Sequence, residues 1–105
     1  MDSYETVMIL APALSAEEAD KVIEKCQAAI VTGGGAVVRV DKMGRKKMAY
    51  SIRRQSEGNY VLIVFTGGGG AVAELERTLR QIETAMRFVT SLVREPKVIV
   101  KPVRV

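Results

Sequence analysis

The spacing of apolar residues, which changes from a strand period to a helix period and back along the chain, most strongly constrains the fold. Residues 4–10 carry Glu5 as their only charge and are apolar on both alternating faces, and residues 60–65 form an unbroken apolar run. Both patterns are typical of strands that are covered on at least one face. We therefore expect these two segments at the centre of a sheet.

Two other segments repeat their apolar residues at helical spacing. The first follows Ser15, which with Glu18 has the capping-box pattern of a helix start, and the glycines at 33–35 end it. The second follows four glycines at 67–70, and we expect exposed ion pairs of Glu76 with Arg80 and of Glu83 with Arg87 on it. The apolar stripes are Ala19, Val22, Ile23, Cys26, Ala29 and Ile30 in the first helix, and Val72, Leu75, Leu79 and Ile82 in the second.

The remaining segments predict two more strands. From residue 36 to residue 52 a strand alternation is disturbed only around Met43 and Gly44, which indicates one long strand with a bulge. Residues 56–59 (Ser-Glu-Gly-Asn) have the composition of a turn, so we expect a hairpin that joins this strand to residues 60–65 there. Residues 88–93 read as the last strand.

The order strand, helix, strand, strand, helix, strand predicts an α+β fold of the ferredoxin-like βαββαβ type. It has a four-stranded antiparallel sheet with two helices on one face. Right-handed crossovers place the first and third strands at the centre. Nothing in this chain covers the other face of the sheet although its strands are apolar on both sides, so we expect an outside partner there.

Positive charge is concentrated in two segments of a chain whose net charge is only +4. Residues 39–54 contain seven cations and one acid, and residues 94–105 contain four cations and one acid. The rest of the chain is acidic on balance, so one side of the protein should bind an anion. Clustered cations that neutralise phosphates and release counterions are typical of RNA binding.

Several kinds of chemistry lack the residues that they need. The chain has no histidine, and its single cysteine, Cys26, lies on the apolar face of the first helix, so we expect no zinc site, no disulfide and no catalytic thiol. Neither glycine run is followed by the Lys-Ser/Thr pair of a phosphate-binding loop. No apolar run approaches the roughly 20 residues of a membrane span, and no leader is apparent. We predict a cytoplasmic protein that is not an enzyme and has no metal and no cofactor.

Three segments carry a family resemblance: residues 4–12, which begin Tyr-Glu-Thr, residues 44–52 (Gly-Arg-Lys-Lys-Met-Ala-Tyr-Ser-Ile), and the second helix region through Val93. The middle segment, which leads to a Gly-x-Tyr strand, is the most specific. In these segments, over about residues 4–94, the chain resembles the bacterial small-subunit ribosomal protein of the number-six family. The resemblance implies a structural constituent of the small subunit that binds the central domain of 16S ribosomal RNA together with small-subunit protein eighteen.

Two positions depart from the pattern of that family. Asp2 and Ser3 stand where the family commonly has a basic residue, so we expect no N-terminal cation on the RNA. The glycines at 67–70 replace a more polar or proline-containing helix entry, so the second helix should lack a side-chain cap and fray at its start.

We predict an RNA-binding surface centred on Arg45, Lys46 and Lys47. Alternating strand residues point to opposite faces, so Arg45 and Lys47 should share one face and Lys46 should lie on the other. A kink at Gly44 would let cations on both faces surround an irregular RNA junction, which is recognised by its shape. Among the tyrosines only Tyr50, beside this triplet, keeps a role in base stacking. The predicted set is Arg45, Lys46, Lys47, Tyr50, Arg53, Arg54, Arg87 and Arg94.

We expect residues 1–95 to form the RNA-binding domain and residues 96–105 to form a basic C-terminal tail. The isolated protein should be a monomer. The alternative function is a dimeric ferredoxin-like small-molecule sensor or enzyme that self-associates through the open sheet face, because this fold serves many unrelated functions. The clustered cations and the resemblance favour RNA.

Overall fold

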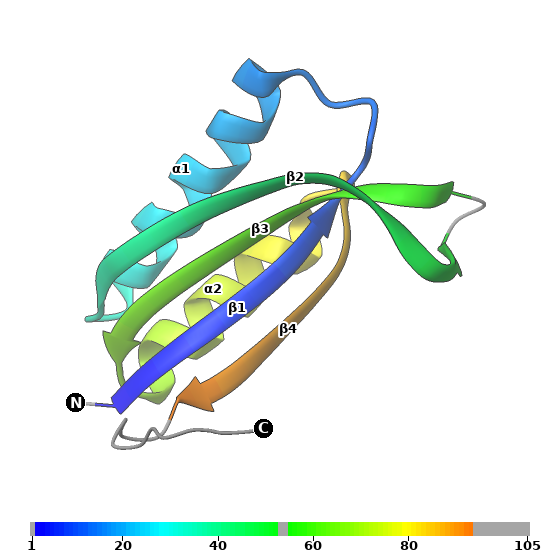
Figure 1. The fold of residues 1–105 in the computed structure, drawn as a ribbon. Helices are drawn as coiled ribbons and strands as arrows, with labels where there is room; N and C mark the ends of the chain where they lie inside the picture. The colour runs from blue at the N-terminus through cyan, green and yellow to red at the C-terminus, as the bar shows by residue number, and fades with distance from the viewer. Residues whose placement is uncertain (1, 53–54, 94–105) are drawn as a thin grey trace, which may run out of the picture.

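A computed structural model of the chain describes residues 2–52 and 55–93, with side chains described for residues 2–48 and 56–93. The elements follow in the order β1 (Asp2–Leu10), α1 (Ala16–Thr32), β2 (Ala36–Ile52), β3 (Gln55–Gly67), α2 (Gly69–Gln81) and β4 (Ala85–Val93). Figure 1 shows a twisted sheet with both helices on the same face. The predicted α+β class and βαββαβ order are confirmed.

The strands form one antiparallel sheet in the order β2-β3-β1-β4. The two strands predicted to be central, β1 and β3, are the inner ones. Val7 at the middle of β1 pairs with Leu62 of β3 on one side and with Val89 of β4 on the other. The apolar character of β1 and β3 therefore follows from their position, since each has a neighbouring strand on both edges.

The core lies between the sheet and the two helices. Tyr4 of β1 stacks on Phe65 of β3, with ring centroids 5.5 Å apart. Burial of each large apolar side chain stabilises the fold by about 1.5–3 kcal/mol. Thr6 is buried in this core, and its hydroxyl is hydrogen-bonded to the Thr90 hydroxyl at 2.8 Å. The largest fully buried apolar side chains are Phe65, Met8, Leu10, Ile30, Ile63, Leu75 and Leu79.

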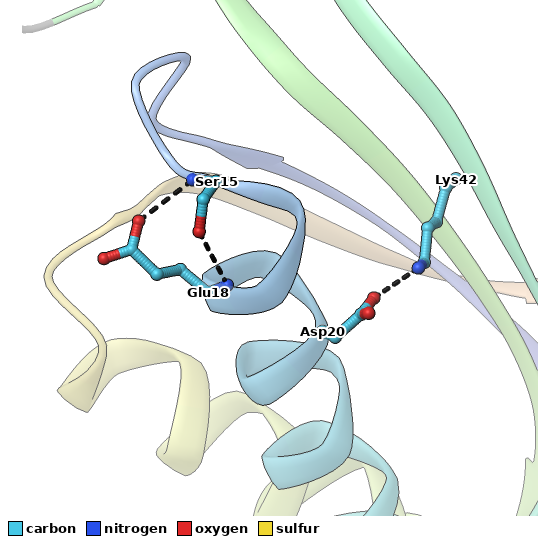
Figure 2. A network of polar contacts seen from close by, with 4 residues as sticks. All are labelled: Ser15, Glu18, Asp20 and Lys42. Carbon is cyan, nitrogen blue, oxygen red and sulfur yellow. Dashed lines mark hydrogen bonds and ion pairs between the residues drawn. The ribbon is translucent and has the colours of Figure 1, made fainter.

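Helix α1 begins and ends as its sequence predicts. The Ser15 hydroxyl accepts a hydrogen bond from the Glu18 N–H at 3.1 Å, and the Glu18 carboxylate accepts one from the Ser15 N–H at 2.9 Å (Figure 2). At the other end Gly34 has φ +90°, its N–H donates to Val31 O, and the Gly35 N–H donates to Ile30 O. These are the bonds of a Schellman ending, for which glycine is the favoured residue.

Helix α2 starts at Gly69 after an N-cap, Gly68, that makes no side-chain cap hydrogen bond, which confirms the predicted absence. Glycines also let this helix start close to the end of α1. A Cβ added to Gly33 would lie 2.5 Å from the Gly70 carbonyl oxygen and 2.6 Å from the Ala71 Cα. The chain segments that enter α2 and leave α1 are therefore in direct backbone contact.

Beyond the helices β2 and β3 continue as a two-stranded arm, defined here as residues 44–52 and 55–60. Figure 1 shows the arm twisting away from the rest of the sheet. The register shifts between Lys42 and Gly44, where Gly44 has φ +84°, so the predicted bulge is confirmed. A second register shift, between Val37 and Arg39, has no counterpart in the sequence prediction.

The turn predicted at residues 56–59 is wrong, although the hairpin itself is confirmed. These residues belong to β3, where Asn59 pairs with Arg45 and Gly58 pairs with Lys46, and after a further register shift beyond Lys47 the last pair is Ile52 opposite Gln55. The glycine serves packing instead of a turn, because a Cβ at Gly58 would lie 2.3 Å from the Ile9 Cγ2 atom. Composition alone does not separate these two uses of glycine.

The end of α2 also differs from the sequence prediction. The helix ends at Gln81, so Glu83 follows it while Arg87 already lies in β4, and the two residues are not one turn apart on a helix as predicted. The other predicted pair is confirmed, with the Arg80 Nη2 atom 3.6 Å from the Glu76 Oε1 atom. Strand β4 begins at Ala85, before the predicted residue 88.

Candidate nucleic-acid interface

The predicted basic triplet lies on the edge strand of the arm. Arg45, Lys46 and Lys47 are exposed, and in register they face Asn59, Gly58 and Glu57 of β3. Side chains of directly paired residues point to the same face of a sheet. Asn59 has the same parity as buried Val61, so Arg45 and Lys47 lie on the helix-bearing face and Lys46 lies on the open face. The predicted division of the triplet is thus present in the register.

Two polar contacts join the base of the arm to α1 and to the connection that leads into it. The Arg45 guanidinium donates a hydrogen bond to the Pro12 carbonyl oxygen at 3.0 Å. The Lys42 ammonium forms an ion pair with the Asp20 carboxylate, as Figure 2 shows. Arg45 is bonded to a neutral oxygen and so retains its full positive charge, whereas the charge of Lys42 is balanced by Asp20.

Arg87 is exposed on β4, at the opposite edge of the sheet from the triplet. It pairs with Ile9, which pairs with Tyr60, which pairs with Gly44. With strands about 4.8 Å apart, three steps across the sheet separate the backbones of residues 87 and 44 by roughly 14 Å. Arg87 shares the open face with Lys46, so the structure does not gather all the predicted cations into one patch.

Four predicted site residues cannot be placed in this surface. The side chain of Tyr50 lies outside the described residues, although its backbone belongs to β2. Arg53, Arg54 and Arg94 also lie outside the described residues. The candidate interface is therefore built here from Arg45, Lys46, Lys47 and Arg87.

The open face of the sheet is apolar at its centre and charged toward its edge at β2. Paired residues place Leu62, Val7 and Val89 in one row across β3, β1 and β4. Val89 has 52% of its surface exposed although it lies in the middle of its strand. The same pairing places Arg39 and Asp41 of β2 on this face, and they form an ion pair of 2.9 Å.

The described part of the chain offers little to reactive chemistry. Within residues 2–52 and 55–93 no group of three or more Cys, Asp and Glu side chains could hold a metal ion. Cys26 is fully buried with its Sγ atom 3.9 Å from the Met8 Sδ atom, and desolvation by burial raises the pKa of its thiol from 9.0 to about 12. No described helix is long and apolar enough to span a membrane.

Two residues outside the predicted site, Lys42 and Asn59, face the same side of the sheet as Arg45. The sequence pattern groups Lys42 with the basic segment and places Asn59 in a turn. The register places both on the helix-bearing face, Lys42 opposite Val61 and Asn59 opposite Arg45. The alternation of buried Val61, Ile63 and Phe65, extended backward along the strand, is the sequence signal that could have oriented Asn59.

These features define a class: a small α+β binding domain of ferredoxin-like topology, with a cationic arm and an apolar open sheet face. The chain belongs to the Ribosomal protein S6 family, whose profile matches residues 3–91. It is 45% identical over 87 residues to "Small ribosomal subunit protein bS6" of Acidobacterium capsulatum, covering 83% of this chain and 62% of that protein. It is 40% identical over 95 residues to the protein of the same name from Moorella thermoacetica, covering 90% of this chain and 97% of that one.

A solved structure agrees with the sequence relatives. The crystal structure of 30S ribosomal protein S6 from Thermotoga maritima superposes with a TM-score of 0.82 at 31% identity, over 88% of this chain and 87% of that chain. The family resemblance predicted from the three segments is confirmed. Because this is a family of ribosomal proteins, the predictions that the chain is not an enzyme and works at the ribosome of the cytoplasm are confirmed as well.

Proposed function

We propose that the chain is a structural constituent of the small ribosomal subunit that binds the central domain of 16S ribosomal RNA, with small-subunit protein eighteen as its neighbour. The observation that carries the RNA contact is the exposed triplet Arg45, Lys46 and Lys47 on an arm that extends past both helices. Family membership supports the ribosomal setting.

The two-sided arrangement of the triplet suits a folded RNA better than a straight row of phosphates. Arg45 and Lys47 project from one face of the arm and Lys46 from the other, so all three cations can contact phosphates together only where RNA lies on both sides of the arm. An irregular junction has that form, and such junctions are recognised by shape and by phosphate contacts. We propose that Tyr50, Arg53, Arg54 and Arg94 extend this contact and that the basic tail at residues 96–105 adds to it.

The open sheet face supports a protein neighbour. Leu62, Val7 and Val89 form a continuous apolar row with no helix of the described chain above them. Apolar patches of this kind commonly mark protein interfaces. We propose that protein eighteen covers this row and that the chain alone is a monomer, as opposed to the dimer of the sensor or enzyme alternative.

Binding to the RNA central domain across a salt series tests the RNA contact. Changing Arg45, Lys46 and Lys47 together to Ala should weaken binding and reduce the slope of log K against log salt by roughly 2 to 3, since each phosphate contact contributes about 0.7–0.9. A charge-matched control changes the exposed helix residues Lys21, Lys25 and Arg80 to Ala. Equal slopes for the two triple variants would refute the proposed role of the arm.

A matched pair of single variants tests the contact with protein eighteen. Val89→Glu on the open face should weaken binding to protein eighteen at least about fivefold, the effect of losing roughly 1 kcal/mol at an interface. Val31→Glu on α1, where the valine is 62% exposed, should leave it unchanged. Gel filtration that shows a dimer stable to salt, with no RNA binding even when protein eighteen is present, would overturn the proposal in favour of the sensor or enzyme alternative.

A further inference from the structure

A groove of about 470 Å³ lies between the start of α1 and the base of the arm, on the helix-bearing face. Pockets of this size commonly take a small organic ligand. The groove exists because the arm twists away from the helices beyond Lys42, which leaves the sheet uncovered at this point. It is separate from the open sheet face, which is the other side of the same strands.

The lining of the groove combines an apolar floor with a small number of polar groups. Leu14, Ala16 and Ala19 line it from the α1 side, and Val61, which is almost completely buried, lines it from β3. The alanines at 16 and 19 make that side shallow, since neither projects beyond its Cβ. Floors of this kind suit a flat apolar surface, such as the face of a nucleobase.

The polar groups lie on the arm side. Asn59 projects toward the groove from β3, and its amide offers both a donor and an acceptor. Arg45, directly opposite Asn59 in register, lines the groove as well, and no acid of the described residues balances its charge, since its partner there is the neutral Pro12 oxygen. Lys42 also lines it but shares its charge with Asp20. The Glu18 carboxylate is bonded to the Ser15 N–H, in the cap of α1.

We propose that this groove binds a single unstacked nucleotide of RNA, with the base between the α1 alanines and Val61, its edge on Asn59 and its phosphate on Arg45. The proposal rests on the proposed RNA-binding function and deepens it. Charge complementarity selects an anionic occupant, and the two-way hydrogen bonding of Asn59 beside an apolar floor matches a base edge. An acidic peptide would use the cation but would leave the amide and the floor without matching groups.

Titration of the full chain with the four nucleoside 5′-monophosphates, followed by two-dimensional amide NMR, tests the site directly. We expect saturable shifts confined to residues 14–19, 42–45 and 59–61, which inorganic phosphate at the same concentration does not produce. Shifts of the same pattern with inorganic phosphate would show only an anion on Arg45 and would overturn the proposal. Shifts at these residues with an acidic peptide but not with nucleotides would overturn it in favour of a protein ligand.

A matched pair of variants separates this site from the rest of the RNA interface. Ala16→Leu fills the groove without changing any charge, and Ala28→Leu makes the same change at another exposed position of α1. We expect Ala16→Leu to remove the nucleotide shifts and to weaken binding to the RNA central domain about tenfold, which equals a loss of about 1.4 kcal/mol. Asn59→Ala should have an effect in the same direction, and Ala28→Leu should have none.

The two proposals fail in different ways. If the wild-type chain binds the central domain and Ala16→Leu binds it equally well, the nucleotide site is refuted while the proposed function stands. If the wild-type chain does not bind the central domain even with protein eighteen present, the proposed function fails. NMR shifts that nucleotides produce at the groove would then show a nucleotide site that does not serve ribosomal RNA binding.

Discussion

Replacement of Gly33 by Ala should measure how closely the end of α1 approaches the start of α2. The new Cβ would lie 2.5 Å from the Gly70 carbonyl oxygen and 2.6 Å from the Ala71 Cα. Carbon atoms in contact prefer separations of about 3.5–4.0 Å, so the two segments would have to part by about 1 Å. Both contacted atoms belong to the backbone, which means that no side chain can rotate away.

The expected cost follows from these contacts. Overpacking of a tightly packed site costs about 1–3 kcal/mol, and the rigid surroundings place Gly33→Ala at the upper end of that range. The φ of Gly33 is −82°, which alanine adopts without strain, so the substitution should recover about 0.4–1 kcal/mol through the unfolded chain. The net loss is about 2 kcal/mol, equivalent to a fall in Tm of about 8–16 °C for a domain of this size.

Urea unfolding followed by circular dichroism measures this change. Gly69→Ala is the matched control, because a Cβ at Gly69 meets nothing within 4 Å and the residue lies in α2. It should raise the free energy of unfolding by up to about 1 kcal/mol. A Gly33→Ala protein as stable as the wild type would refute the close approach of the two helix ends and the reasoning built on it.

Three further predictions concern the start of α1 and the core. Ser15→Ala removes the capping box and should lower the free energy of unfolding by about 1 kcal/mol in urea titrations, whereas the same change at the exposed Ser56 should have little effect. Thr6→Val leaves the half-buried Thr90 hydroxyl without its partner and should cost about 1 kcal/mol, the lower end of the range for a lost partner because water can still reach Thr90. The double variant with Thr90→Val should restore most of this loss, and additive losses in the cycle would contradict the hydrogen bond. Burial raises the pKa of the Cys26 thiol from 9.0 to about 12 in the folded protein. The contribution of this thiol to stability is therefore complete below pH 9 and is lost as the pH rises toward 12. Thermal unfolding measured against pH should show this decline in the wild type and less of it in Cys26→Ala.

Local signals in the sequence predicted most of the fold. The Ser15 and Glu18 capping box, the glycine ending of α1 and the bulge at Gly44 each depend on neighbouring residues alone, and each is present. The turn at residues 56–59 could not be predicted correctly in this way. Gly58 is required by its contact with Ile9, and that contact arises only when β1 and β3 pair.

The candidate site was predictable to a smaller extent. Strand alternation assigned Arg45 and Lys46 to opposite faces, because parity is a local property. The predicted topology already places the last strand at the far edge of the sheet, but the spacing of Glu83 and Arg87 assigned Arg87 to the second helix, and only the pairing of β4 with β1 sets it opposite Ile9. The groove requires the twist of the arm relative to α1, so neither its existence nor the roles of Lys42 and Asn59 could be read from the sequence.

The central position of β1 has a consequence for synthesis of the chain. Strand β1 is made before both of its neighbours, β3 and β4, and Val7 must wait for Val89 before its second edge is paired. Sequence-distant pairings are slow to form, and unpaired strand edges are prone to aggregation. The sheet therefore cannot close until the chain through Val93 has left the exit tunnel, and until then the newly made β1 is exposed to wrong partners.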